Sequence, residues 1–106
     1  MTEAQKLNVE LREARRNADY CRGRVSGGNP FFLLVQAGHS VLIDDDEMTG
    51  NSHRHRWLVV DGDHIGRRST WTGLEKLARK ALVSRDLAAL KRAEMDREDR
   101  EARRGR

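Results

Sequence analysis

The sequence predicts an α+β fold with an N-terminal helix, a small antiparallel sheet of three or four strands, and a long C-terminal helix packed on the sheet. Apolar residues recur every three to four positions at both ends of the chain, whereas the middle contains short apolar runs separated by turn signals. The net charge is +2 over residues 1–24, −2 over residues 25–74 and +4 over residues 75–106. A basic binding surface is therefore expected mainly on the helices.

The N-terminal segment, residues 1–24, is predicted to form a helix from about residue 3 to residue 22. Thr2 and Gln5 have the spacing of a capping box, in which each side chain binds the backbone N–H of the other residue. A narrow apolar stripe then recurs at steps of three and four, and it consists of Ala4, Leu7, Leu11, Ala14, Ala18 and Cys21. Gly23 is the expected end of this helix.

The sheet is predicted within residues 31–68. Phe31–Gln36 is an apolar run with branched and aromatic residues, which indicates a central strand. A turn leads from it to a returning strand at Val41–Asp44, and a polar loop follows as far as His53.

Two further strands are expected at Arg54–Val60 and Asp63–Arg68. They are joined by Asp61-Gly62, a strong signal for a two-residue hairpin turn. The last strand is mostly polar, which is typical of a sheet edge. Trp57 lies in an apolar stretch and is expected in the core.

The C-terminal helix is predicted over residues 72–100, with Thr70 or Thr72 as its N-cap. Its core-facing positions follow the helical period and are Leu74, Leu77, Ala78, Ala81 and Leu82. From Arg92 on the sequence is mostly charged, and residues 101–106 are expected to fray.

A second apolar group falls on the opposite side of this helix and consists of Val83, Leu87 and Leu90. Two interpretations are open. Either the helix breaks near Ser84, which can cap a new helix, or one long helix has two apolar faces. In the second case one face needs a partner from outside the domain.

The composition limits the class of protein. A chain of 106 residues supports a single domain. Its longest apolar runs are far shorter than the roughly 18–20 residues that cross a bilayer, and no signal peptide or membrane contact is expected. The single cysteine, Cys21, cannot form an internal disulfide, which favours a reducing, cytoplasmic location.

The first functional hypothesis is a small intracellular accessory or regulatory protein that acts by protein contact. Its interface is the second apolar group together with Trp71, and its partner is another protein or a second copy in a symmetric homodimer. Small, highly charged chains of this kind are common among phage and mobile-element products.

The alternative hypothesis is a nucleic-acid-binding module. Arginines on the predicted hairpin and cations on the last helix can contact phosphates, and these residues are Arg54, Arg56, Arg67, Arg68, Lys76, Arg79 and Lys80.

A third and weaker hypothesis is a metal-binding loop over residues 44–55, with Asp44, Asp46, His53 and His55 as ligands. The sequence has no nucleophile elbow, phosphate-binding loop or established zinc spacing. We therefore expect no enzymatic activity, no cofactor and no small-molecule substrate.

Overall fold

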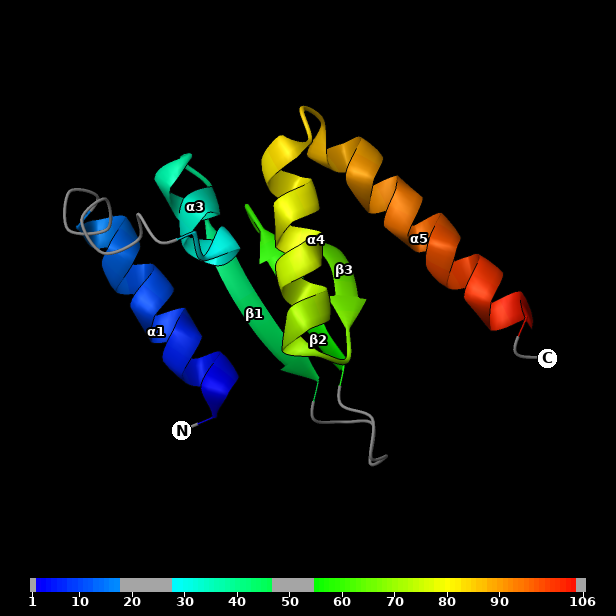
Figure 1. Cartoon of the computed structure of the whole chain (residues 1–106), viewed down its shortest axis with the longest axis horizontal. Coiled ribbons are helices and arrows are strands. Elements are labelled where there is room, and N and C mark those ends of the chain that lie inside the picture. Colours follow the sequence, from blue (N-terminus) through cyan, green and yellow to red (C-terminus); the bar gives the residue numbers. More distant parts are fainter. Residues whose placement is uncertain (1, 18–27, 47–54, 105–106) are drawn as a thin grey trace.

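The computed structural model describes residues 2–17, 28–46 and 55–104, and it confirms the predicted fold class (Figure 1). The elements, labelled as in Figure 1, are α1 (Glu3–Arg16), α3 (Pro30–Gln36), β1 (Val41–Asp46), β2 (His55–Val60), β3 (Asp63–Arg68), α4 (Trp71–Val83) and α5 (Leu87–Arg104). The three strands form an antiparallel sheet in the order β1-β2-β3. Among the described residues, no helix is long and apolar enough to span a membrane.

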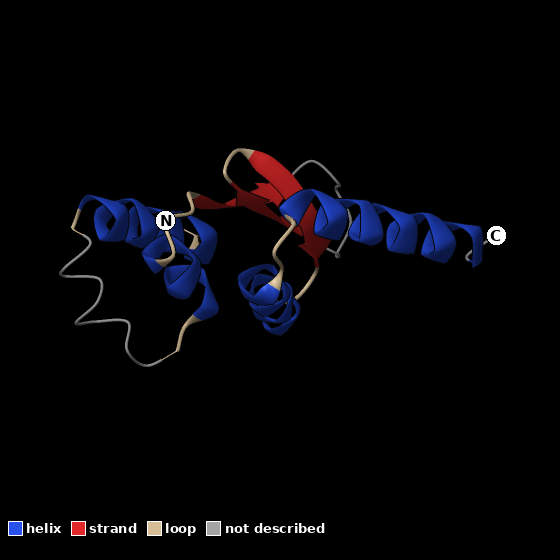
Figure 2. Cartoon of the chain, turned by 90° about the horizontal axis from the view of Figure 1, so that it is seen from above, coloured by secondary structure: helices blue, strands red, loops and turns tan. Residues whose placement is uncertain are grey.

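The helices lie on one side of the sheet and along its two edges (Figure 2). Helices α3 and α4 lie on one face, α1 lies beside β1, and α5 runs alongside β3. No described helix covers the other face of the sheet. One face of the sheet is therefore covered by helices, and the other face is covered by no described helix.

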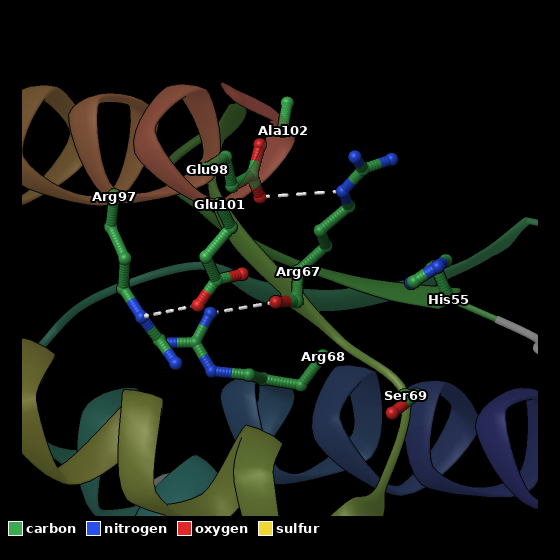
Figure 3. A pocket seen from close by; sticks show the side chains of 8 residues that line it. All are labelled: His55, Arg67, Arg68, Ser69, Arg97, Glu98, Glu101 and Ala102. Carbon is green, nitrogen blue, oxygen red and sulfur yellow. Dashed lines mark hydrogen bonds and ion pairs between the residues drawn. The ribbon is translucent and has the colours of Figure 1, made fainter. Parts of the chain in front are cut away.

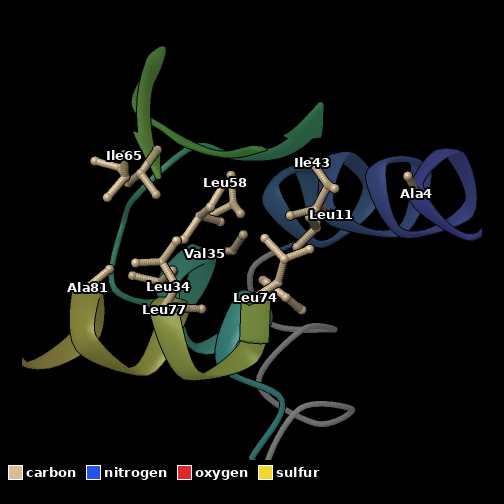
Figure 4. Packing of buried hydrophobic residues seen from close by; sticks show 14 of the residues in the cluster. Ala4, Leu11, Leu34, Val35, Ile43, Leu58, Ile65, Leu74, Leu77 and Ala81 are labelled. Carbon is tan, nitrogen blue, oxygen red and sulfur yellow. The ribbon is translucent and has the colours of Figure 1, made fainter. Parts of the chain in front are cut away.

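The core lies between the sheet and α3 and α4 (Figure 4). Along β1, Val41 and Ile43 are buried while Leu42 is exposed, as the two-residue period of a strand requires. The fully buried side chains that fill the core include Leu11, Phe31, Leu34, Ile43, Leu58, Ile65, Leu74 and Leu77. Burial of these apolar side chains is the main force that holds the layers together.

The segment predicted as a central strand is helix α3, so the expectation of a strand at Phe31–Gln36 is wrong. The Asn29 side chain accepts a hydrogen bond from the Phe31 N–H at 3.0 Å, and Pro30 occupies the first helical position. Both features favour a helix start. A short apolar run fits a buried helix as well as a strand, and this cap decides between them.

The N-terminal helix begins as predicted and ends earlier. Both hydrogen bonds of the capping box are present, between Thr2 and Gln5. The helix ends at Arg16, because Asn17 leaves the helical region with φ −121° and ψ 70°. Ala18, Cys21 and Gly23, which were expected in and after its last turns, lie outside the described residues.

The hairpin agrees with the prediction. Asp61 and Gly62 both have positive φ, 54° and 84°, as a two-residue hairpin turn requires. Strand β1 continues to Asp46, two residues beyond the predicted end, and Arg54 lies outside the described residues.

The segment predicted as one C-terminal helix is divided at Ser84. Of the two interpretations left open by the sequence, the structure therefore agrees with the helix break. Ser84 adopts an extended conformation and ends α4. The new helix is capped by Asp86, and not by Ser84, because its Oδ1 accepts hydrogen bonds from the N–H groups of Ala88 and Ala89. Helix α5 continues to Arg104, four residues beyond the predicted end of the helix at residue 100.

Candidate functional site

Charge is segregated around α5. Glu94, Glu98 and Glu101 follow one another at steps of four and three, so they share one side of the helix. Arg97, Arg100 and Arg104 are placed in the same way on an adjacent side. The first two glutamates pair with arginines of β3, which turns the acidic side of α5 towards the sheet.

Glu94 is the only buried residue of α5 and is 4 % exposed. Its Oε2 accepts a hydrogen bond from Arg68 Nη2 at 2.8 Å, and Arg97 Nη1 lies 3.7 Å from the same oxygen. Lys80 Nζ of α4 lies 3.7 Å from Oε1. One carboxylate therefore faces three cations, and two positive charges remain uncompensated by it.

Glu94 can approach β3 closely because residue 66 is glycine. A Cβ atom at Gly66 would lie 3.4 Å from Glu94 Cγ and 3.1 Å from Leu77 Cδ2. Gly66 therefore allows both α4 and α5 to pack against the same point of β3.

A cleft of about 380 Å³ lies between β3 and α5 (Figure 3). Its lining consists of His55, Arg67, Arg68, Ser69, Arg97, Glu98, Glu101 and Ala102. Arg67 Nε lies 3.3 Å from Glu98 Oε1, and Arg97 Nε lies 3.4 Å from Glu101 Oε1. His55 Nδ1 is buried there without a hydrogen-bond partner among the described residues.

A second cleft, of about 450 Å³, lies between α4 and α5. Its lining consists of Lys80, Leu90, Ala93, Glu94, Arg97, Arg100, Glu101 and Arg104. Arg97 and Glu101 line both clefts, so the two clefts form one continuous surface. Arg100 Nε donates only to the backbone oxygen of Asp96, at 3.4 Å, and Arg104 has no ion-pair partner among the described residues.

We call this region the α5 arginine surface, and its six cations are Arg67, Arg68, Lys80, Arg97, Arg100 and Arg104. Three carboxylates, Glu94, Glu98 and Glu101, lie among them. Six positive and three negative charges leave a net charge of +3. A surface of this kind attracts anions and offers guanidinium groups for bidentate contacts.

The structure brings together three of the cations predicted for the nucleic-acid hypothesis, namely Arg67, Arg68 and Lys80. Arg56 lies elsewhere, because its guanidinium is 4.8 Å from the Trp71 ring and donates to the Ser69 oxygen. Lys76 and Arg79 are exposed on α4 without an ion-pair partner in the described part of the chain. Arg54 lies outside the described residues.

Sequence reasoning did not select Arg97, Arg100 and Arg104. Their spacing along the helix is visible in the sequence, but the neighbouring acids made the segment look uniformly charged. Only the pairing of Glu94 and Glu98 with β3 shows that these carboxylates turn to the sheet, while Arg100 and Arg104 have no carboxylate partner among the described residues.

The residues predicted for a protein interface do not form one face. Val83 is 82 % exposed at the end of α4, whereas Leu87 and Leu90 belong to α5 and pack partly against the core. Trp71 is partly buried beside Arg56. The break at Ser84 separates Val83 from the two leucines.

The predicted metal ligands do not form a site among the described residues. Asp44 Oδ2 lies 3.1 Å from His64 Nε2, while His55 lines the cleft beside β3. His53 and the side chain of Asp46 lie outside the described part of the structure. The described residues contain no group of three histidines, cysteines or carboxylates that could hold a metal ion.

A polar contact joins the β2–β3 turn to the start of β1. Asp61 Oδ2 lies 2.8 Å from His39 Nδ1, and Asp61 Oδ1 accepts a hydrogen bond from the Ser40 N–H at 2.9 Å. The hydrogen bond with His39, and next the one with Ser40, lower the pKa of Asp61 below its usual value of 3.8. This contact is separate from the α5 arginine surface.

Comparison of the chain with models of protein families, with curated proteins and with solved structures finds no match.

Proposed function

We propose that this chain is a non-catalytic protein that binds the phosphate backbone of a nucleic acid on the α5 arginine surface. The observation that supports this proposal most directly is the charge segregation around α5. The helix directs Glu94 and Glu98 to the sheet. Arg97, Arg100 and Arg104 line a cleft that also contains Lys80, and among them only Arg97 has carboxylate partners in the described part of the chain, Glu94 and Glu101.

Arginine suits this task because its planar guanidinium can donate two parallel hydrogen bonds to one phosphate. Arg100 and Arg104 have no carboxylate partner among the described residues, so they can bind a phosphate without first breaking an ion pair. Arg97 can exchange its exposed partner Glu101 for a phosphate at small cost, since exposed ion pairs contribute little. A role as a cytoplasmic accessory or regulatory factor is compatible with such binding.

The test is fluorescence anisotropy of a labelled oligonucleotide titrated with the protein at several salt concentrations. The double variant Arg100→Glu/Arg104→Glu should bind at least about tenfold more weakly, because two phosphate contacts become repulsive. The slope of log K against log salt should fall by about 1.4–1.8 in magnitude if each arginine neutralises one phosphate.

The matched control is Arg12→Glu/Arg16→Glu. These arginines are exposed on α1, away from the clefts, and the substitutions change the net charge by the same amount. We expect only a small loss of affinity for this variant. Equal losses for the two double variants would mean that the bound site is not the α5 arginine surface, and no measurable binding by the unaltered protein would contradict the proposal itself.

A second candidate function is contact with a protein partner, or with a second copy of the chain, at the junction of α4 and α5. The observation in its favour is the exposure of the Val83 side chain at this junction. Light-scattering mass across a dilution series should reveal a homodimer, and Val83→Glu should abolish it. A monomer at every concentration would contradict self-association.

A further inference from the structure

One face of the sheet is covered by no described helix (Figure 2). The strand register places a tryptophan, Trp57 of β2, on this face. The residues of this face, taken from the strand register, are Leu42, Asp44, Trp57, Val59, His64 and Arg67. Trp57 is only partly buried and does not belong to the core cluster, so its expected place in the core is wrong. The reason is that β2 directs Leu58 and Val60 inward, and the intervening odd-numbered side chains point the other way.

Both edges of the sheet are already occupied, so this face is the part of the sheet left for a partner. At the β1 edge, the Asn8 side chain of α1 binds both the N–H and the C=O of Ile43 at 2.7 Å. This amide satisfies the groups that a further strand would use. At the β3 edge, α5 lies alongside the strand.

Trp57 is surrounded by polar groups on this face. The ring of His64 meets it edge-on, with centroids 5.5 Å apart, and the Arg67 guanidinium lies 5.4 Å from its centroid. His64 also bonds Asp44 across β2. This contact spans β2 and explains why Val59 is only 6 % exposed although no described helix lies above it.

Arg67 connects this face to the α5 arginine surface. Its guanidinium lies over the Trp57 ring and also pairs with Glu98 of α5 in the cleft beside β3. His55, two residues before Trp57 on the same strand, lines that cleft too. A nucleic-acid chain whose phosphates lie in this cleft would therefore pass directly beside Trp57.

We propose that the ligand is a single-stranded nucleic acid and that Trp57 stacks on one of its unpaired bases. This inference rests on the proposed function and narrows its ligand. Arg67 orients the neighbouring phosphate, and the indole supplies an apolar surface that accepts any base. A duplex holds its bases inside the double helix. Its phosphates can contact the arginines, but its bases cannot stack on Trp57.

The experiment uses Trp57 as its own probe. The chain has two tryptophans, so Trp71→Phe leaves Trp57 as the only one. This variant is titrated with oligothymidylate of about fifteen nucleotides, a length typical of single-strand sites. An abasic strand of equal length and charge and a duplex of equal length serve as the comparison ligands.

We expect oligothymidylate to quench the Trp57 fluorescence and to bind about tenfold more tightly than the abasic strand. Trp57→Leu in the full chain should reduce the affinity for oligothymidylate to that for the abasic strand, whereas Trp57→Phe should retain part of the difference. The two substitutions should leave the affinity for the abasic strand unchanged.

Equal binding of the three ligands with no quenching would overturn the stacking inference and leave the phosphate-binding proposal intact. Failure of all three ligands to bind would contradict both. If Trp57→Leu fails to fold, the comparison of oligothymidylate with the abasic strand still decides, because it is made on a protein that retains Trp57.

Discussion

Helices α4 and α5 are consecutive in the chain, but different forces hold them on the sheet. Helix α4 buries four apolar side chains, Leu74, Leu77, Ala78 and Ala81, each 2 % exposed or less. The only buried residue of α5 is the charged Glu94. Helix α4 is therefore part of the core, whereas α5 is attached by ion pairs together with the partly buried Leu87 and Leu90.

This difference bears on function. Screening by salt does not weaken apolar burial, whereas it weakens exposed ion pairs as the ionic strength rises. A polyanion of the proposed kind would compete for the same arginines whose charges salt screens. The position of α5 and the binding of a ligand are thus expected to respond to the same electrostatic conditions, while α4 and the rest of the core remain unchanged.

The largest loss of stability is expected from a substitution in the contact between α4 and the sheet. Leu77→Ala removes a fully buried side chain that packs close to Gly66, and it should lower the free energy of unfolding by about 3 kcal/mol. Urea denaturation followed by circular dichroism measures this loss. A loss below about 1 kcal/mol would contradict the assignment of α4 to the core.

A smaller loss of stability, confined to α5, is expected from a substitution in the contact between α5 and β3. Glu94→Gln keeps the shape of the side chain but leaves Arg68 without its charged partner, at a cost of about 2 kcal/mol. Hydrogen exchange should show protection lost in α5 and retained in α4. Raising the salt concentration on the unaltered protein should shift exchange in the same direction.

Glu98→Gln is the matched control for Glu94→Gln. It lies one turn further along α5, and its pair with Arg67 is more exposed than the pair between Glu94 and Arg68. We expect a loss of less than about 1 kcal/mol. An equal loss of unfolding free energy for the two variants would show that the burial of Glu94 does not determine how strongly α5 is attached to the sheet.

The contrast between α4 and α5 also explains what the sequence could predict. Helix α4 follows from the spacing of its leucines and alanines, and the hairpin follows from Asp61-Gly62, because these signals are local. Helix α3 was missed because a short apolar run has no distinctive period, although Asn29 and Pro30 mark a helix start.

The candidate site depends on contacts between residues distant in sequence. Arg67, Arg68 and Lys80 could be selected by charge alone. The role of Glu94 could not be predicted, because a buried carboxylate breaks the apolar pattern and its partner Arg68 is 26 residues away. Without this pair, nothing in the sequence distinguishes the arginines of α5 that are paired from those that have no carboxylate partner in the described part of the chain.

The smallest change in stability is expected at a third contact, between Asp61 and His39. Like the contact of α5 with β3 it is polar, but it is more exposed. Because the pKa of Asp61 is lowered in the folded state, its contribution to stability is complete above the unfolded value of 3.8 and is lost as the pH falls through the folded value. Asp61→Asn removes this contribution and still tolerates the positive φ of 54°.

We expect the unaltered protein to exceed Asp61→Asn in unfolding free energy by less than about 1 kcal/mol near neutral pH, since the Asp61 side chain is 47 % exposed. The difference should shrink as the pH falls below 3.8 and disappear at the pH at which the carboxyl group of the folded protein is also protonated. Urea denaturation of both proteins as a function of pH measures it. A difference that stayed constant down to this pH would mean that hydrogen-bond geometry, and not the charge of Asp61, stabilises the turn, and the α5 contact alone would then respond to electrostatic conditions.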